Sequence, residues 1–156
     1  MQLGMIGLGR MGANIVRRLL RDGHSCVVYD VSPAAVAALV AEGATGSGSL
    51  DEFVARLDVP RRAWIMVPAG EITESTVTEL AARLGDGDTI IDGGNSYYRD
   101  DIRRAAELAR KSIRYVDCGT SGGVFGLERG FCLMVGGPDD AFAELEPVFA
   151  SLAPGV

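Results

Sequence analysis

The chain opens with a short apolar run that leads directly into a glycine-rich turn, Leu3-Gly4-Met5-Ile6-Gly7-Leu8-Gly9-Arg10-Met11-Gly12. The run predicts a buried β-strand, and the amphipathic segment Met11–Arg21 predicts a helix. Within the turn, Gly7 permits the tight bend, Gly9 lets a ligand approach the backbone, and Gly12 lets the helix pack closely on the strand. A strand, a turn of this spacing and a helix are typical of the first unit of a parallel α/β sheet.

A carboxylate stands where such a unit holds the ribose of a dinucleotide. Asp30 lies about 18 residues after Gly12, at the end of the second predicted strand. A carboxylate there accepts hydrogen bonds from an adenosine ribose, and the N–H groups at the start of the first helix suit phosphates. The alternative is that Asp30 caps the helix at Pro33 or lies in a solvated turn. We predict that Gly7 to Gly12 and Asp30 bind a dinucleotide.

The same carboxylate favours NAD over NADP. A 2′-phosphate beside Asp30 would meet like charge, and Val31-Ser32-Pro33 provides no arginine to offset it. Arg10 has two interpretations: it folds over the adenosine, or it is a solvated residue at the start of the helix. NAD is the expected cofactor.

Short apolar or β-branched runs alternate with longer segments rich in Ala, Leu and Arg. This alternation predicts a Rossmann-like, doubly wound, mostly parallel α/β sheet with helices on both faces, in a single domain over residues 1–156. Gly43–Ser49 is a predicted loop, and the break at Leu152–Val156 suggests that the chain was cut from a longer protein. The predicted strands are Leu3–Ile6, Ser25–Tyr29, Ala63–Val67, Thr89–Asp92, Arg114–Asp117 and Phe131–Val135, and the predicted helices are Met11–Arg21, Pro33–Glu42, Leu50–Leu57, Glu74–Leu84, Tyr98–Lys111 and Asp139–Leu152.

Composition narrows the class of protein. A hydrophobic content of 47% and a net charge of −6 suit a globular protein and argue against a nucleic-acid partner. Cys26, Cys118 and Cys132 show no paired spacing, so we expect neither a disulfide framework nor a metal site. We expect no membrane span, because no apolar run approaches ~18 residues, and we expect a cytoplasmic protein without a signal peptide.

A second glycine-rich segment follows the strand at Thr89–Asp92. It reads Gly93-Gly94-Asn95-Ser96 and leads into the helix predicted at Tyr98. One interpretation is that the glycines supply unusual backbone angles while Asn95 or Ser96 caps the helix. The other is that bare backbone and an amide side chain meet a ligand.

Two more strands end in sharp turns. The strand exit Met66-Val67-Pro68-Ala69-Gly70 is expected to lie against the cofactor, with Val67, Pro68 and Ala69 as the contacts, although a plain turn explains it nearly as well. Ser121-Gly122-Gly123 offers a hydroxyl and backbone N–H groups, which suit the carboxylate or hydroxyl of a small acid. A structural loop is the alternative for this segment.

Together these motifs resemble the N-terminal domain of the decarboxylating 6-phosphogluconate dehydrogenases over essentially the whole chain. The cofactor turn is Gly7–Gly12, the strand exit is Val67–Gly70, the substrate loop is Thr120–Gly123, and the discriminating motif is Ile91–Asp100. Related 3-hydroxyacid dehydrogenases share the fold and a similar Ser-Gly-Gly loop but lack Asp-Gly-Gly-Asn-Ser.

The resemblance is to the shorter, NAD-preferring bacterial branch of that family. Asp30 and the stretch Gly126–Gly130 look like that branch. The NADP-using branch usually has an Asn-Arg-Thr-like sequence where this chain has Asp30-Val31-Ser32.

The resemblance also implies roles for the residues. Asn95 would touch both the nicotinamide and the substrate, and Ser121, Gly122 and Gly123 would hold the sugar acid. The implied chemistry is oxidation of 6-phosphogluconate by hydride transfer, loss of CO2 from the β-keto acid, and protonation of the enediol to ribulose 5-phosphate.

The lysine base and glutamate acid of the family lie beyond the Rossmann domain. We therefore expect an all-helical catalytic and dimerisation domain after residue 156, a homo-oligomer at full length, and no activity from residues 1–156 alone. Lys111, the only lysine, is expected to be a solvated helix-end residue, and His24 a turn or packing residue.

Two other functions stay open. One is a 3-hydroxyacid dehydrogenase or reductase that transfers a hydride without decarboxylation. The other is a non-catalytic NAD-sensing module, which would leave Gly93-Gly94-Asn95 and Ser121-Gly122-Gly123 without a purpose.

Overall fold

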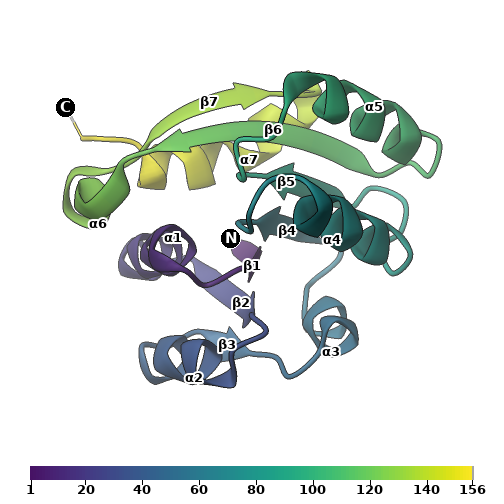
Figure 1. Cartoon of the computed structure of the whole chain (residues 1–156). Coiled ribbons are helices and arrows are strands. Elements are labelled where there is room, and N and C mark those ends of the chain that lie inside the picture. Colours follow the sequence, from purple (N-terminus) through teal and green to yellow (C-terminus); the bar gives the residue numbers. More distant parts are fainter. Residues whose placement is uncertain (156) are drawn as a thin grey trace.

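A computed structural model describes residues 1–155 as one seven-stranded sheet with helices on both faces (Figure 1). The strands are β1 (Gln2–Ile6), β2 (Ser25–Tyr29), β3 (Thr45–Gly46), β4 (Arg62–Ile65), β5 (Thr89–Asp92), β6 (Arg114–Ser121) and β7 (Cys132–Gly136). The helices are α1 (Arg10–Arg21), α2 (Pro33–Ala41), α3 (Leu50–Ala55), α4 (Glu71–Ala81), α5 (Tyr98–Ala109), the 3-10 turn η1 (Gly123–Phe125), α6 (Gly126–Arg129) and α7 (Asp139–Leu152).

The strand order is β3-β2-β1-β4-β5-β6-β7, and every neighbouring pair is parallel except β6 and β7. The order reverses on either side of β1, because β2 lies on one side and β4 on the other. In open α/β sheets the crevice at such a reversal, beyond the carboxyl ends of the strands, is where ligands bind. The predicted Rossmann-like, mostly parallel sheet is confirmed.

Two apolar cores lie on the two faces of the sheet. The helices α1, α2 and α7 pack on one face, where Ile15, Leu39 and Phe149 are buried. The helices α3, α4 and α5 pack on the other, where Phe53 and Leu80 are buried. Figure 1 shows α1 and α2 to the left of the central strands and α3 and α4 to the right.

The sheet differs from the prediction at three places. The predicted loop Gly43–Ser49 contains the two-residue edge strand β3, which is too short to give a hydrophobic pattern. Strand β6 continues four residues past Asp117, so Ser121 ends a strand. The chain after Ser121 does not cross back to the other edge of the sheet before β7 begins. Strand β7 therefore runs antiparallel to β6.

The helices differ from the prediction at one boundary and in one stretch of the chain. Helix α4 begins at Glu71, three residues earlier than predicted, because Gly70 is its N-cap with a φ of +95°. The short helices η1 and α6 occupy a stretch for which no helix was predicted. Within residues 1–155, no helix is both long enough and apolar enough to cross a membrane.

Candidate functional site

The turn after β1 separates glycines that the fold requires from one that it does not. Gly7 has a φ of +91°, and a Cβ on it would stand 2.2 Å from the carbonyl oxygen of Met66. A Cβ on Gly12 would stand 2.0 Å from the carbonyl oxygen of Gly7. A Cβ on Gly9 would meet no atom within 4 Å. Gly7 and Gly12 allow the close approach of strand and helix, whereas the space beside Gly9 is open to a ligand.

The start of α1 is suited to an anion. Gly9 is the N-cap, no side chain caps the helix, and its first turn has no acidic residue. The free N–H groups and the partial positive charge of this end favour a phosphate. Leu8 is buried and Met11 is partly buried against the core, while Arg10 is exposed.

Asp30 ties this turn to the end of β2. One carboxylate oxygen accepts a hydrogen bond from the N–H of Leu8 at 2.7 Å, and the other accepts from the N–H of Ser32 at 2.8 Å. The cap of α2 is Ser32, whose hydroxyl accepts from the N–H of Ala35. The cap interpretation of Asp30 is therefore wrong. A carboxylate has about four acceptor positions, so two remain for ribose hydroxyls.

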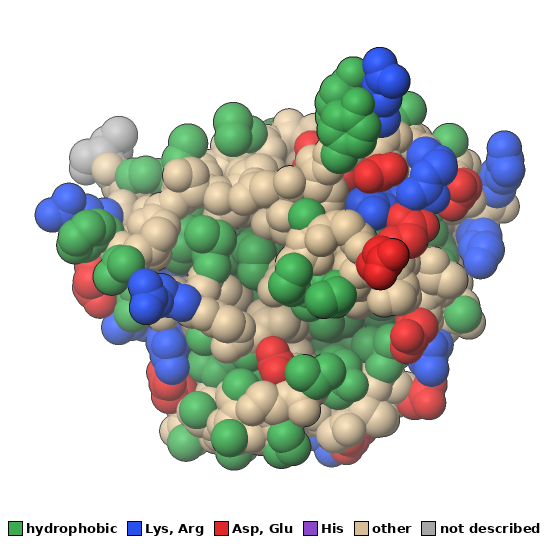
Figure 2. Space-filling model, in the orientation of Figure 1, with side chains coloured by type: hydrophobic (Ala, Val, Ile, Leu, Met, Phe, Trp, Pro, Cys, Tyr) green, Lys and Arg blue, Asp and Glu red, His purple; other side chains and the backbone are tan. Residues whose placement is uncertain are grey.

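A cleft of about 510 Å³ opens at the reversal of strand order. Of the residues predicted to bind a cofactor, Gly7, Gly9, Asp30, Val67 and Pro68 line it. The others, Leu8, Arg10, Met11, Gly12, Ala69 and Asn95, are not among its lining residues. Figure 2 shows hydrophobic side chains lining the hollow in the middle of this face. Met66, from the strand exit expected to lie against the cofactor, lines it as well. The prediction missed the remaining walls, which are Ile6, Tyr29, Val31, Leu50, Ile72, Ser75, Thr76 and Glu79.

One signal could have found part of this wall. Ile72 is 52% exposed in the first turn of α4, an unusual place for a large apolar side chain unless it contacts a ligand. A largely apolar cleft with a carboxylate at its edge suits an adenosine.

A second cavity, of about 350 Å³, lies on the other side of Asp30. It contains Arg56, which the sequence around Asp30 did not indicate. Arg56 forms an ion pair with Glu52 at 2.5 Å and donates a hydrogen bond to the carbonyl oxygen of Gly46. Arg56 is thus paired with Glu52 and not with Asp30.

The Gly93–Ser96 turn is explained by close packing. A Cβ on Gly93 would stand 2.3 Å from Nε1 of Trp64, and one on Gly94 would stand 2.9 Å from the carbonyl oxygen of Val67. The residue with a left-handed backbone is Asn95, with a φ of +53°. The expectation of unusual angles at the two glycines is wrong.

Neither Asn95 nor Ser96 caps the following helix. The N-cap of α5 is Tyr97, which makes no side-chain cap hydrogen bond. The hydroxyl of Ser96 instead donates to Asp92 at 2.5 Å. The cap interpretation, which was the structural alternative for this motif, is therefore wrong.

The side chain of Asn95 reaches the second predicted substrate segment. Its Oδ1 accepts a hydrogen bond from the N–H of Thr120 at 3.1 Å, and its Nδ2 donates to the carbonyl oxygen of Thr120 at 3.5 Å. Ser121 follows as the last, exposed residue of β6, and Gly123 turns the chain with a φ of +50°. The structure thus brings Asn95 and Ser121–Gly123 together at the carboxyl edge of the sheet, outside the residues that line the cofactor cleft.

Three carboxyl groups gather beneath this edge, on Asp92, Asp101 and Asp117. Asp92 and Asp117 are partners across β5 and β6, and Asp101 lies in the first turns of α5. Burial is the main cause that raises the pKa of Asp117 to about 6. Perturbed carboxyl groups of this kind affect stability as well as chemistry.

We expect the Asp117→Asn variant to lose part of the pH dependence of folding stability. Below about pH 6 the folded protein holds a proton on Asp117 that the unfolded chain takes up only near pH 4. This group therefore adds to the free energy of unfolding as the pH falls from about 7 to about 4. Urea titrations at pH 7.5 and 4.5 should show a wild-type advantage over Asp117→Asn that grows at the lower pH. An equal difference at both values would contradict this, and Asp58→Asn, on an exposed surface, serves as the control.

The one histidine and the one lysine, the side chains that most often transfer protons, lie away from the glycine-rich turns. His24 precedes β2, with Nε2 2.8 Å from the hydroxyl of Ser151 on α7. Lys111 is exposed in the connection between α5 and β6. Both lie at the amino edge of the sheet, opposite the glycine-rich turns. Within residues 1–155, no group of three or more His, Cys, Asp or Glu side chains is arranged to hold a metal ion.

Comparison with known proteins identifies relatives along the whole chain. The family model described as the NAD binding domain of 6-phosphogluconate dehydrogenase matches residues 2–156. The NAD(+)-dependent, decarboxylating 6-phosphogluconate dehydrogenase of Haloferax volcanii is 48% identical over 155 residues, which are 99% of this chain and 51% of that protein. The decarboxylating 6-phosphogluconate dehydrogenase of Synechococcus elongatus is 39% identical, over 97% of this chain and 33% of that protein. The chain therefore spans about half or less of the length of these relatives.

Solved structures of a 6-phosphogluconate dehydrogenase and of a 3-hydroxyisobutyrate dehydrogenase share this fold. A 6-phosphogluconate dehydrogenase of Plasmodium falciparum, described with its cofactor NADP+ and with its substrate, superposes with a TM-score of 0.92 at 25% identity, over 100% of this chain and 35% of that one. The 3-hydroxyisobutyrate dehydrogenase of Mycobacterium tuberculosis has a TM-score of 0.88 at 28% identity, over 97% of this chain and 52% of that one.

Proposed function

This chain belongs to the family of NAD-binding domains of 6-phosphogluconate dehydrogenase, and we propose that it binds NAD for the oxidative decarboxylation of 6-phosphogluconate by a longer, cytoplasmic protein. One observation carries the proposal: the uncapped start of α1 and the open space at Gly9 lie beside Asp30 at the mouth of an apolar cleft. A pyrophosphate fits the helix start, and an adenosine fits the cleft.

The cofactor contacts follow from this placement. The backbone of Gly7 to Gly12 holds the pyrophosphate, Asp30 accepts from the ribose hydroxyls, and Arg10 extends from the helix start toward the adenosine. Val67, Pro68 and Ala69 lie along the cofactor, and Asn95 contacts the nicotinamide.

The substrate lies at the edge where Asn95 meets β6. Asn95, Ser121, Gly122 and Gly123 hold the carboxylate and hydroxyl groups of a sugar-acid phosphate. When bound, NAD would supply the acceptor for the hydride on the carbon that bears the 3-hydroxyl group. The residues of this chain orient the two reactants, whereas the lysine base, the glutamate acid and the phosphate contacts come from an all-helical domain after residue 156, which also makes the protein a homo-oligomer.

We expect the chain to bind NADH more tightly than NADPH. Asp30 repels a 2′-phosphate, and Arg56, the arginine in the adjoining cavity, is paired with Glu52. Calorimetric titration of residues 1–156 with both cofactors measures the preference. Asp30→Ser combined with Val31→Arg should move it toward NADPH, because the change removes a negative charge and adds a positive one. Equal or tighter binding of NADPH by the wild type would rule out the preference.

The likeness to a 3-hydroxyisobutyrate dehydrogenase, which shares this fold, supports a second candidate function. In that case the full-length protein would oxidise a 3-hydroxy acid without releasing CO2. Assaying CO2 release from 6-phosphogluconate by the full-length protein separates the two functions.

A further inference from the structure

Asp92 is a buried carboxylate that the proposed function does not use. It is the last residue of β5 and is fully buried. Its Oδ1 accepts a hydrogen bond from the N–H of Gly94 at 2.9 Å, and its Oδ2 accepts from the hydroxyl of Ser96 at 2.5 Å. These two bonds hold the residues on either side of Asn95. Asp92 therefore fixes both ends of the short segment that carries the asparagine.

Two further groups hold Asp92 from below. The hydroxyl of Tyr115 on β6 lies 2.9 Å from Oδ2, and Nη1 of Arg104 on α5 lies 3.5 Å from the same atom. The Arg104 side chain is 3% exposed, and its Nε also donates to Glu74 on α4 at 2.8 Å. A buried carboxylate needs such partners, because an isolated charge in the interior is costly. The turn is thereby connected to α4, α5 and β6.

The number of protons available for hydrogen bonding indicates the protonation state of Asp101. The hydroxyl of Tyr115 lies 2.8 Å from Oδ1 of Asp101 as well as 2.9 Å from Asp92. A phenol has one proton to donate, so it cannot donate to both carboxylates. Because Arg104 lies nearer to Asp92 than to Asp101, the negative charge belongs on Asp92: the phenol donates to Asp92 and accepts a hydrogen bond from the protonated carboxyl group of Asp101. Burial raises the pKa of Asp101, in agreement with that state.

We propose that Asp101, Tyr115 and Asp92 form a hydrogen-bonded chain that positions Asn95 for the nicotinamide. Asp101 donates to Tyr115, Tyr115 donates to Asp92, and Asp92 accepts from both sides of Asn95. None of the three touches cofactor or substrate, so they are positioning residues. The inference rests on the proposed contact between Asn95 and the nicotinamide. Figure 2 shows the exposed rim of this region, where acidic and basic side chains gather over α4 and α5.

The experiment compares NADH with ADP-ribose, which has the adenosine and pyrophosphate but no nicotinamide. Tyr115→Phe keeps the ring and removes the hydroxyl, and Ser96→Ala removes a tether at a partly exposed position. Each should weaken NADH binding by about three- to tenfold, which is the loss of one well-placed hydrogen bond. Binding of ADP-ribose should stay within about twofold. A merely structural role would weaken both ligands equally.

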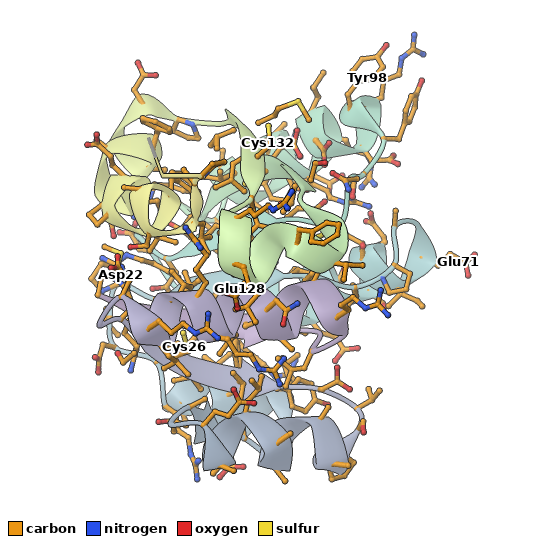
Figure 3. All side chains as sticks on the ribbon, turned by 90° about the vertical axis from the view of Figure 1, so that its left-hand side faces the viewer. Asp22, Cys26, Glu71, Tyr98, Glu128 and Cys132 are labelled. Carbon is orange, nitrogen blue, oxygen red and sulfur yellow. The ribbon has the colours of Figure 1, made fainter. Side chains whose placement is uncertain are left out.

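Two more variants test whether Asp101 is the protonated group and whether Tyr115 acts through Asn95. Asp101→Asn should bind NADH nearly as the wild type does, because an amide N–H replaces the carboxyl proton as the donor to Tyr115. In an Asn95→Ala background, Tyr115→Phe should cause no further loss, because residues that act through one another are not additive. Tyr98→Phe is the matched control: Tyr98 borders the same cavity as Asp101 and Tyr115, but it is 57% exposed and its hydroxyl accepts from Arg99 instead of joining the chain (Figure 3).

The outcomes are distinct. Unchanged NADH binding by both Tyr115→Phe and Ser96→Ala, an equal loss of ADP-ribose binding, or additive losses with Asn95→Ala would overturn the positioning chain. A wild-type chain that binds neither ADP-ribose nor NADH would instead overturn the proposed function. Melting of each variant, followed by the fluorescence of Trp64, verifies that the compared proteins are folded.

Discussion

Replacing Asn95 with alanine in the full-length enzyme should lower kcat/KM for 6-phosphogluconate by roughly ten- to a thousandfold, a few kcal/mol at most. A polar group oriented at the reacting centre acts chiefly in the transition state, so kcat should fall with kcat/KM. The fold should lose roughly 1 to 3 kcal/mol, because the change removes two hydrogen bonds to Thr120 and puts alanine at a φ of +53°, which asparagine tolerates better. Such bonds contribute about 1 kcal/mol each.

The control is Asn14→Ala on α1, which removes one hydrogen bond from Arg17 and lies outside the proposed site. It should leave kcat/KM unchanged and alter the melting temperature only slightly, because alanine suits a helix interior. If Asn95→Ala instead behaved as Asn14→Ala does, with normal turnover per folded molecule, Asn95 would have no part in catalysis.

The order of elements could be predicted because most strands and helices carry their own signal. The apolar run before Gly7 and the apolar face of Met11–Arg21 define β1 and α1 without any knowledge of their neighbours. β3 could not be predicted, because Thr45 and Gly46 form a strand only by pairing with Val27 and Val28 at the edge of the sheet. The direction of β7 depended in the same way on the route of the chain after Ser121.

The glycine-rich turns were predictable because each follows a strand, and the carboxyl ends of parallel strands meet at one edge. What the sequence did not reveal was how the turns are held. Asp92, Arg104 and Tyr115 are separated along the chain and meet only through β5, α5 and β6. Likewise, Arg56 enters the cavity beside Asp30 only because α3 lies next to β3 and β2.

Residues 1–156 alone should not oxidise 6-phosphogluconate at a measurable rate, even when saturated with NAD. Removing a hydride from a secondary alcohol requires its hydroxyl proton to leave to a positioned base, which contributes about two to four orders of magnitude. His24 and Lys111 lie at the opposite edge of the sheet. Asp117, whose pKa is raised to about 6, lines a separate cavity with Tyr98 and Gly136, away from the cofactor cleft.

The measurement is NADH formation by the purified chain. Calorimetry on the same sample verifies that the cofactor is bound. Binding should survive, because the turns proposed to hold NAD lie within the described residues, while turnover should stay at the background of a protein-free control. Ser121→Ala and Asn95→Ala distinguish true activity from contamination, since a contaminating dehydrogenase would be unaffected by either change. Steady NADH formation that both variants abolish would place the base within this chain, and the carboxyl groups beneath the Asn95 turn would then be the first side chains to test.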